Sequence, residues 1–191
     1  MLLGVVLLYV GAVLVVNGIW LLGQARAAAG GTDVEVHPTF IQNREVAVLN
    51  LFTGFVGVVA AVTLMVQGNR DEDLASLRGA GYILLFAFTY LWVAANNFLN
   101  AGGLAFGWYC LFVAITAVPA GIWALVNADG SDASIYLGFC WFAWAVLWFL
   151  FFLLLALDRP VARLAGAVAV LEGIATAWVF GILLLEDQIA F

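Results

Sequence analysis

Glu172 is the one ionisable side chain that lies deep inside an apolar stretch of this sequence. A charged carboxylate near the middle of a membrane-spanning helix costs about 2.5–3.5 kcal/mol on insertion scales, so it generally faces a cavity or a polar partner. Two interpretations follow. Glu172 either bonds a neighbouring helix as a structural group, or it accepts hydrogen bonds from a polar solute. No arginine lies at a comparable depth to neutralise the carboxylate, which favours the second interpretation.

Asn17 is the other strongly polar residue in this pattern. Leu7, Val10, Leu14 and Asn17 follow one another at offsets of 0, 3, 7 and 10, so they share one stripe of a helix. Asparagine commonly bonds one membrane helix to another. The stripe is therefore compatible with helix packing and with the wall of a passage.

Tryptophans give a more specific pattern. Trp141, Trp144 and Trp148 occur at i, i+3 and i+7, which places them on one helical stripe. Phe88 and Trp92, four residues apart, predict a second aromatic face. Large rings in contact with lipid need no function, and membrane tryptophans usually lie at the headgroup level. The depth of Trp144 sets the first stripe apart from that ordinary case.

The elements that position these residues must be membrane-spanning helices. Of the 191 residues, 66% are hydrophobic and 9% are charged, whereas a soluble domain averages about 25% charged residues. A soluble domain of about 150 residues buries only about 70% of the surface that its chain exposes, too little to hide so apolar a chain. The net charge of −6 offers no basic surface to nucleic acid. The sequence therefore predicts an integral membrane protein.

Six apolar stretches each approach the roughly 20 residues that a membrane-crossing helix needs. Strands of a membrane barrel need only about 9–11 residues and alternate in polarity. The predicted fold is therefore an all-α bundle of six transmembrane helices, forming a single domain over residues 1–191. The spans are predicted at 2–22, 46–66, 81–99, 104–126, 135–157 and 164–185. Similar endings of the first and fourth spans, NGIW and AGIW, hint at a weak 3+3 inverted repeat.

Arginines predict the orientation of these spans. Four arginines lie in the first, third and fifth loops, against two, Arg70 and Arg78, on the side of both termini. Because arginine is enriched in cytoplasmic loops, we expect the odd-numbered loops inside and both termini outside.

A passage with aromatic and aliphatic walls and few polar contacts suits a neutral solute. Ion pathways are built from rings of carboxylates, carbonyls or basic groups. A small planar amide such as urea or acetamide could slide between ring faces, with one or two polar groups replacing the hydrogen bonds it loses. Enzymatic activity is not predicted, because the chain offers no nucleophile–base–orienter set. Cys110 and Cys140, both in apolar runs, predict no metal site, cofactor or disulfide.

At these residues the sequence resembles the AmiS/UreI family of urea and short-chain amide channels. Five segments, in order along the chain, carry the resemblance: LLYVG (7–11) with Asn17-Gly18, LLFAFTYL (84–91), WYCLFVAI (108–115), WFAWAVLW (141–148), and LEGI (171–174) with TAW (176–178). The resemblance implies six helices per protomer, a solute path through each protomer, and a homohexamer around a lipid-filled centre. It also implies a multi-pass protein of the bacterial cytoplasmic (inner) membrane.

Motif matching to this family places the pore-lining residues. They fall on Leu7, Val10, Leu14, Asn17, Phe88, Trp92, Trp141, Trp144, Leu147, Trp148 and Glu172, of which Leu147 comes from the resemblance alone. Trp92 stands where the family's tyrosine is expected, which would remove a hydroxyl group from the passage. Urea, acetamide and formamide are the predicted solutes.

Two mechanisms stay open. The first is a passive channel, and the alternative is a proton-coupled carrier in which Glu172 shuttles protons. Acid-activated members of the family carry histidines in external loops, because histidine titrates between about pH 5 and 8. The single histidine of this chain, His37, lies in a loop predicted to be inside. We therefore expect little gating by acid.

Overall fold

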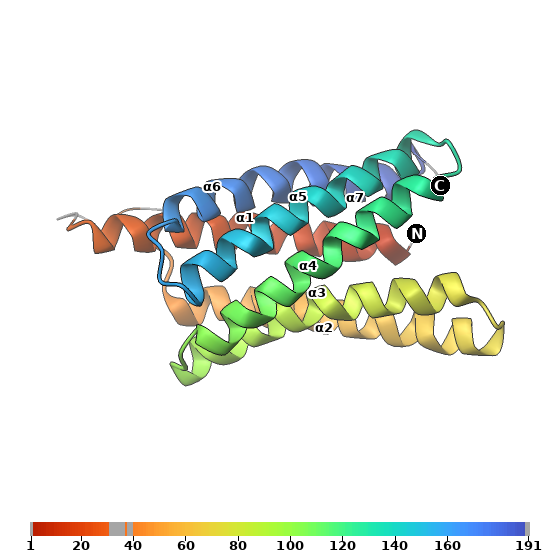
Figure 1. Ribbon diagram of the computed structural model, residues 1–191. Helices are drawn as coiled ribbons and strands as arrows, with labels where there is room; N and C mark the ends of the chain where they lie inside the picture. The colour runs from red at the N-terminus through yellow and green to blue at the C-terminus, as the bar shows by residue number, and fades with distance from the viewer. Residues whose placement is uncertain (1, 31–36, 38–39, 190–191) are drawn as a thin grey trace.

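The computed structural model describes residues 2–30, 37 and 40–189, and its described residues contain six helices long and apolar enough to cross a membrane. Figure 1 shows the predicted all-α architecture. Five crossings are single helices: α1 (Leu2–Ala28), α2 (Asn43–Arg70), α3 (Leu74–Leu99), α4 (Leu104–Val126) and α5 (Asp132–Leu155). The sixth joins α6 (Ala162–Glu172), a π-helical segment η1 (Gly173–Val179) and α7 (Phe180–Leu185).

Polar caps extend several helices beyond the apolar stretches. The carboxylate of Asp73 accepts hydrogen bonds from the backbone N–H groups of Ala75 and Ser76 at 2.9 and 3.1 Å. These bonds satisfy donors that a helix leaves free at its start, so α3 begins at Leu74 rather than at the predicted residue 81. The added turns carry Arg78 into the helix.

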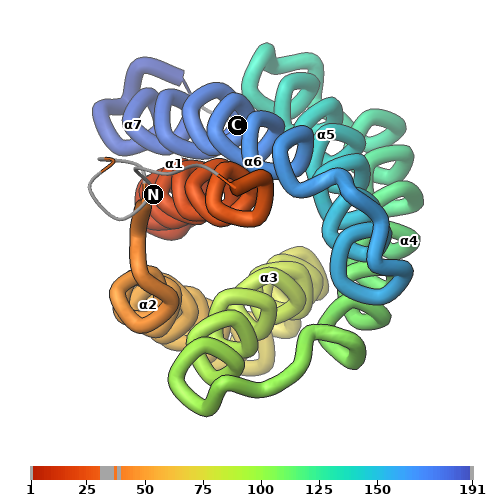
Figure 2. Tube along the Cα trace, turned by 90° about the vertical axis from the view of Figure 1, so that its left-hand side faces the viewer, coloured from red at the N-terminus to blue at the C-terminus, as the bar shows by residue number. Residues whose placement is uncertain are grey.

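The crossings form a ring in chain order, and α1 closes the ring by lying beside α6 and α7 (Figure 2). Close seams alternate with loose ones. The close seams join α2 to α3, α4 to α5, and α1 to the last crossing, whereas α1–α2, α3–α4 and α5–α6 touch much less. A 3+3 repeat would match the close α2–α3 seam with an equally close α5–α6 seam, so this pattern does not reflect the repeat suggested by the sequence.

Glycines allow α1 and the last crossing to pack backbone against backbone. A Cβ atom added to Gly11 would lie 2.6 Å from the backbone nitrogen of Trp178. The same closeness recurs at three levels, formed on α1 by Gly4, Gly11 and Gly18 and opposite them by Gly181, Gly173 and Gly166. The glycines of α1 are seven residues apart, whereas Gly166 and Gly173 are seven apart and Gly173 and Gly181 are eight apart. The extra residue falls within η1. A π-helical turn accommodates an inserted residue and so keeps the glycines facing one another.

Candidate functional site

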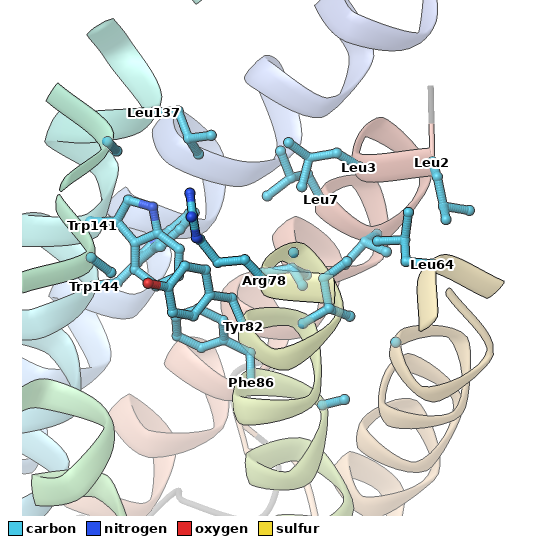
Figure 3. Close-up of a pocket in the computed structure, with 18 of the residues that line it drawn as sticks. Leu2, Leu3, Leu7, Leu64, Arg78, Tyr82, Phe86, Leu137, Trp141 and Trp144 are labelled. Carbon is cyan, nitrogen blue, oxygen red and sulfur yellow. The ribbon is translucent and has the colours of Figure 1, made fainter. Parts of the chain in front are cut away.

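A cavity of about 560 Å³ lies inside the ring, in the half that contains the N-terminal end of α1. It reaches the helix ends at Leu2 and Asn127, and its walls come from α1 to α5 (Figure 3). The lining is mostly aliphatic and aromatic. Arg78 is the only residue of the described lining with a charged side chain.

A second cavity of about 190 Å³ occupies the other half of the ring. Three asparagines give it a more polar lining, namely Asn17, Asn96 and Asn97. Leu14, Tyr90 and Trp148 line both cavities. We call these three residues the shared ring. The two cavities therefore lie end to end along the helices and adjoin at the shared ring.

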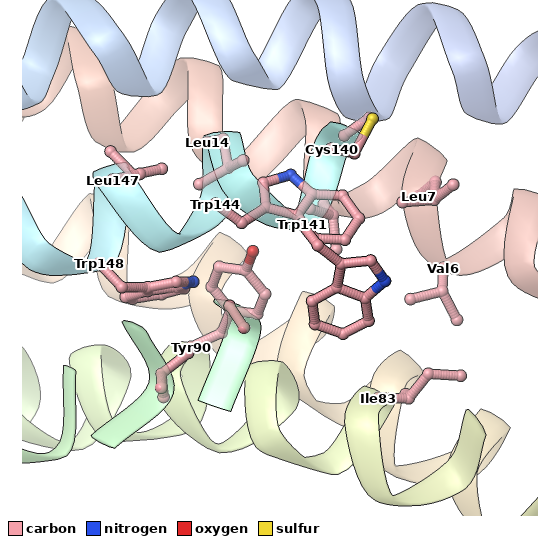
Figure 4. Packing of buried hydrophobic residues seen from close by; sticks show 14 of the residues in the cluster. Val6, Leu7, Leu14, Ile83, Tyr90, Cys140, Trp141, Trp144, Leu147 and Trp148 are labelled. Carbon is pink, nitrogen blue, oxygen red and sulfur yellow. The ribbon is translucent and has the colours of Figure 1, made fainter. Parts of the chain in front are cut away.

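Aromatic rings in mutual contact form the wall near the shared ring. The ring centroid of Phe86 lies 5.5, 5.3 and 6.0 Å from those of Trp141, Trp144 and Trp148. Tyr82 adds an edge contact to Trp141 at 4.8 Å. Figure 4 shows the tryptophans of α5 opposite Tyr90 of α3. Such offset and edge-to-face contacts stabilise aromatic pairs by about 0.5–1.5 kcal/mol beyond their burial, so each ring supports the position of the next.

A hydrogen-bond chain fixes the orientation of Trp144. Its indole Nε1 donates to Oγ1 of Thr176 at 2.9 Å, and that hydroxyl donates to the backbone carbonyl of Glu172 at 2.7 Å. The indole N–H is thereby used within the protein, which leaves the face of the ring for the cavity. Thr176 was not predicted as a site residue, although its place four residues after Glu172 could have indicated a bond to that turn.

Glu172 itself is buried, with 9% of its surface exposed, and lines neither cavity. Within the described residues, its Oε2 atom has no hydrogen-bond partner. The backbone carbonyl of Glu172 is linked to the cavity wall through the hydroxyl group of Thr176 and the indole N–H of Trp144. The expected position of its carboxyl group on the wall of the passage is therefore not what the structure shows.

Asn17 combines the two interpretations that the sequence left open. It lines the smaller cavity, and it also exchanges two hydrogen bonds with Asn50 of α2. The Nδ2 of Asn17 donates to Oδ1 of Asn50 at 3.0 Å, and the reverse bond measures 2.7 Å. Asn50 is fully buried and donates a further bond to the carbonyl of Val46. This pair is a strong polar link across the loose α1–α2 seam.

Phe88 and Trp92 are the predictions that the structure corrects. Phe88 is 47% exposed on the outer surface, and Trp92 packs at a tilt against Phe106 and Tyr109; neither lines either of the two cavities. Phe86 and Tyr90 line the larger cavity instead. A shift of two residues turns a helix by about 200°, so the sequence selected the opposite face of α3. Because Tyr90 provides a tyrosine in the shared ring, the loss of a hydroxyl group expected from Trp92 does not arise.

The other predicted positions lie close together. Those on the larger cavity are Leu7, Val10, Leu14, Trp141, Trp144, Leu147 and Trp148. Residues that the sequence did not single out complete the wall, above all Tyr82, Phe86, Tyr90 and Arg78.

Carboxylates in the loops at the larger cavity's end have partners of their own. Hydrogen bonds from Ser134 and Ser131 lower the pKa of Asp129 to about 2. Arg70 lowers the pKa of Asp71, with which it forms a salt bridge of 2.7 Å. Bonds from Ser76 and Ala75 lower the pKa of Asp73. These three carboxylates therefore stay charged throughout the neutral and mildly acidic range.

Known proteins resemble this chain over nearly its whole length. The pattern of the AmiS/UreI family transporter matches residues 37–188. An amidate substrates transporter protein of Mycolicibacterium smegmatis is 40% identical over 97% of this chain and 77% of its own length. An acid-activated urea channel of Helicobacter pylori is 34% identical over 93% of this chain and 94% of its own length.

Solved structures agree with these sequence comparisons. The crystal structure of the Helicobacter pylori urea channel matches with a TM-score of 0.81 and 32% identity, over 100% of both chains. The cryo-EM structure of that channel in its closed state also gives 0.81, over 98% of this chain and 100% of the other. The chain thus belongs to the AmiS/UreI family of transporters.

Proposed function

We propose that this protein is a passive channel for urea and small neutral aliphatic amides, which cross each protomer between aromatic walls. The observation that carries the proposal is the meeting of the two cavities at the shared ring of Leu14, Tyr90 and Trp148. Relatives that are named as a urea channel and an amidate transporter support the same class of solute.

The lining explains why a neutral planar solute is favoured. Transfer of an amide from water into an apolar cavity without new hydrogen bonds costs several kcal/mol. The solute therefore needs polar groups along the walls of the cavities. The smaller cavity offers the side chains of Asn96 and Asn97, and the shared ring offers the hydroxyl group of Tyr90. Flat indole faces between these groups exclude bulky, non-planar solutes. Ions would find no ring of carboxylates or carbonyls to replace their hydration.

Flux through proteoliposomes tests the channel directly. Vesicles with the purified protein are mixed in a stopped-flow instrument with urea, acetamide, formamide or glycerol, and their shrinkage and reswelling are followed. We expect urea and the two amides to enter much faster than they enter vesicles of lipid alone. Equal rates with and without protein for all four solutes would overturn the proposal.

A matched pair of variants tests the path itself. Leu14→Trp adds an indole to the shared ring, so it should abolish solute flux. Val5→Trp adds the same group on the same helix at an exposed position, so it should leave flux unchanged. Full flux in the Leu14→Trp variant would show that solutes take another route.

A proton-coupled carrier is the second candidate, and the unpartnered Oε2 of buried Glu172 favours it. A carboxyl group without a fixed partner could exchange a proton during each cycle. Glu172→Gln separates the two mechanisms. A carrier would lose uphill accumulation driven by a proton gradient, whereas a channel would keep downhill flux. Glu186→Gln, at the exposed end of the last crossing, is the control.

The remaining features of the proposal rest on the family. We propose a homohexamer in the bacterial inner membrane, with both termini outside and without an enzymatic activity. The relative from Helicobacter pylori is named acid-activated, but the one histidine of this chain is His37, in the α1–α2 connection at the opposite end from the larger cavity. We therefore propose that acid does not gate this channel through histidine.

A further inference from the structure

Arg78 places a positive charge on the wall of the larger cavity. It lies in the second turn of α3, and Figure 3 shows its side chain among the residues that line the cavity. Its Cζ atom stands 5.0 Å from the ring centroid of Trp123, another lining residue, which belongs to α4. Arginine stacked on an aromatic face keeps its full charge, because the guanidinium group does not deprotonate in proteins. The charge is therefore fixed in place and permanent.

No carboxylate neutralises this charge within the part of the chain that the structure describes. The single salt bridge found there joins Arg70 to Asp71. Asp73 is engaged by the first turn of α3, and Asp129 by Ser131 and Ser134. Asp71, Asp73 and Asp129 are thus committed to local bonds, and no salt bridge among the described residues engages the guanidinium of Arg78.

Without this charge, the larger cavity would attract cations. The faces of Trp141, Tyr82 and Phe86 line it, and aromatic faces attract ammonium and guanidinium groups by about 0.5–2 kcal/mol in proteins. A cleft with low-dielectric walls also concentrates the field of a fixed charge. One arginine at this place therefore acts against the preference that the aromatic walls would otherwise create.

We infer that Arg78 is a specificity-determining residue, whose guanidinium group keeps cations shaped like the solute out of the larger cavity while neutral amides enter. The inference rests on the proposed channel function and adds the discrimination between a neutral amide and its charged analogue. Guanidinium is the suitable probe, because it is planar and three-branched like urea but permanently positive.

The experiment measures urea flux in proteoliposomes while the guanidinium concentration is raised. Sodium chloride keeps the ionic strength constant. Removal of one fixed charge a few ångströms away changes the occupancy of a cation about fivefold even in water. We therefore expect guanidinium to block urea flux at an about fivefold lower concentration in Arg78→Gln than in the unaltered protein. The shift should be larger still in Arg78→Glu, and Arg78→Lys should retain the original resistance.

Arg70→Gln is the matched control, because Arg70 loses the same charge at the same end of the molecule but lines neither cavity. Its block by guanidinium should match that of the unaltered protein. The shift in Arg78→Gln should also shrink at about 1 M salt, where the Debye length falls to about 3 Å.

Urea flux without guanidinium reports on the proposed function separately, and the block of each variant is expressed relative to that variant's own uninhibited urea flux. If all variants conduct urea and all are blocked at the same guanidinium concentration, the role of Arg78 is refuted and the channel stands. If Arg78→Lys behaves like Arg78→Gln, packing on Trp123 rather than charge would be responsible, and the inference would equally fail.

Discussion

The amide pair of Asn17 and Asn50 gives the sharpest test of how this ring is held together. Replacement of one asparagine by leucine, which has a similar size, removes both hydrogen bonds of the pair. The two single variants should differ. Asn17→Leu leaves the Oδ1 of Asn50 without a partner at a fully buried position. Asn50→Leu leaves Asn17 beside the smaller cavity, where water can replace the lost bonds.

The expected magnitudes follow from this asymmetry. An unpaired buried polar group costs about 1–3 kcal/mol, so Asn17→Leu should lower the free energy of unfolding by about 2 kcal/mol. Hydrogen bonds between membrane helices contribute about 0.6 kcal/mol each on average, so Asn50→Leu should cost about 1 kcal/mol. The double variant leaves no orphaned amide and should cost no more than Asn50→Leu alone. The coupling energy is then about 2 kcal/mol.

Unfolding by sodium dodecyl sulfate in mixed micelles measures all four proteins, with loss of tryptophan fluorescence as the signal. Asn43→Leu is a control, since Asn43 bonds Trp20 between the same two helices but at the exposed end, and it should change stability little. Two results would refute the reasoning. One is additivity of the single variants within about 0.5 kcal/mol, and the other is a greater loss for Asn50→Leu than for Asn17→Leu.

Three further predictions concern the passage, the glycine seam and pH. Phe86→Ala should change urea flux several-fold in the stopped-flow assay because it removes the ring that contacts three tryptophans. Phe88→Ala, on the outer surface, should leave the urea flux unaltered. Equal effects of the two substitutions would refute the assignment of the cavity-facing side of α3. Gly11→Ala should destabilise the fold by about 1–3 kcal/mol through overpacking, because the added Cβ atom would lie 2.6 Å from backbone. Gly81→Ala should not destabilise the fold, because its Cβ atom would have no neighbour within 4 Å. Thermal unfolding of the two variants compares their stabilities. Urea flux should stay within about twofold between pH 5 and pH 7.5. A carboxylate whose pKa is lowered on folding stabilises the protein above the pKa of the unfolded chain, about 3.9, and loses this contribution as the pH falls toward the pKa of the folded protein. That folded pKa is about 2 for Asp129, so its contribution stays complete at pH 5. A severalfold rise of urea flux at pH 5 would contradict this prediction.

Local hydropathy was enough to predict every membrane crossing of the described residues, because the hydropathy of a segment depends only on the residues within that segment. The stripe of Trp141, Trp144 and Trp148 lies on the side of α5 that faces the larger cavity. Three tryptophans at helical spacing define a single face of the helix, so the sequence alone groups them. Leu147, which rested on the resemblance, lines the same cavity.

The face of α3 could not be predicted in the same way. Its sequence FAFTYLW contains two interleaved aromatic pairs at i, i+4, namely Phe86 with Tyr90 and Phe88 with Trp92. Periodicity treats the two pairs alike. Only the packing of Phe86 against α5 decides between them, and packing is a property of two helices rather than of one segment.

Arg78 and the π-helical segment were missed for related reasons. The apolar stretch predicted α3 to start at residue 81, so Arg78 was counted as a loop charge that only set orientation. The cap at Asp73 adds the turn that brings Arg78 to the cavity. The extra residue in η1 becomes visible only when Gly173 and Gly181 are compared with their partners on α1.

The glycine seam between α1 and the last crossing also has a consequence for the order of assembly during synthesis. A ribosome makes α1 long before it makes α6 and α7, and domains of a growing chain fold from the N-terminal end. Until the last crossing has been inserted, Gly11 and Gly18 have no backbone to pack against, and the main contact of α1 with the earlier helices is the seam to α2, which contains the Asn17–Asn50 pair. The close packing of α1 can therefore form only after α6 and α7 have been made.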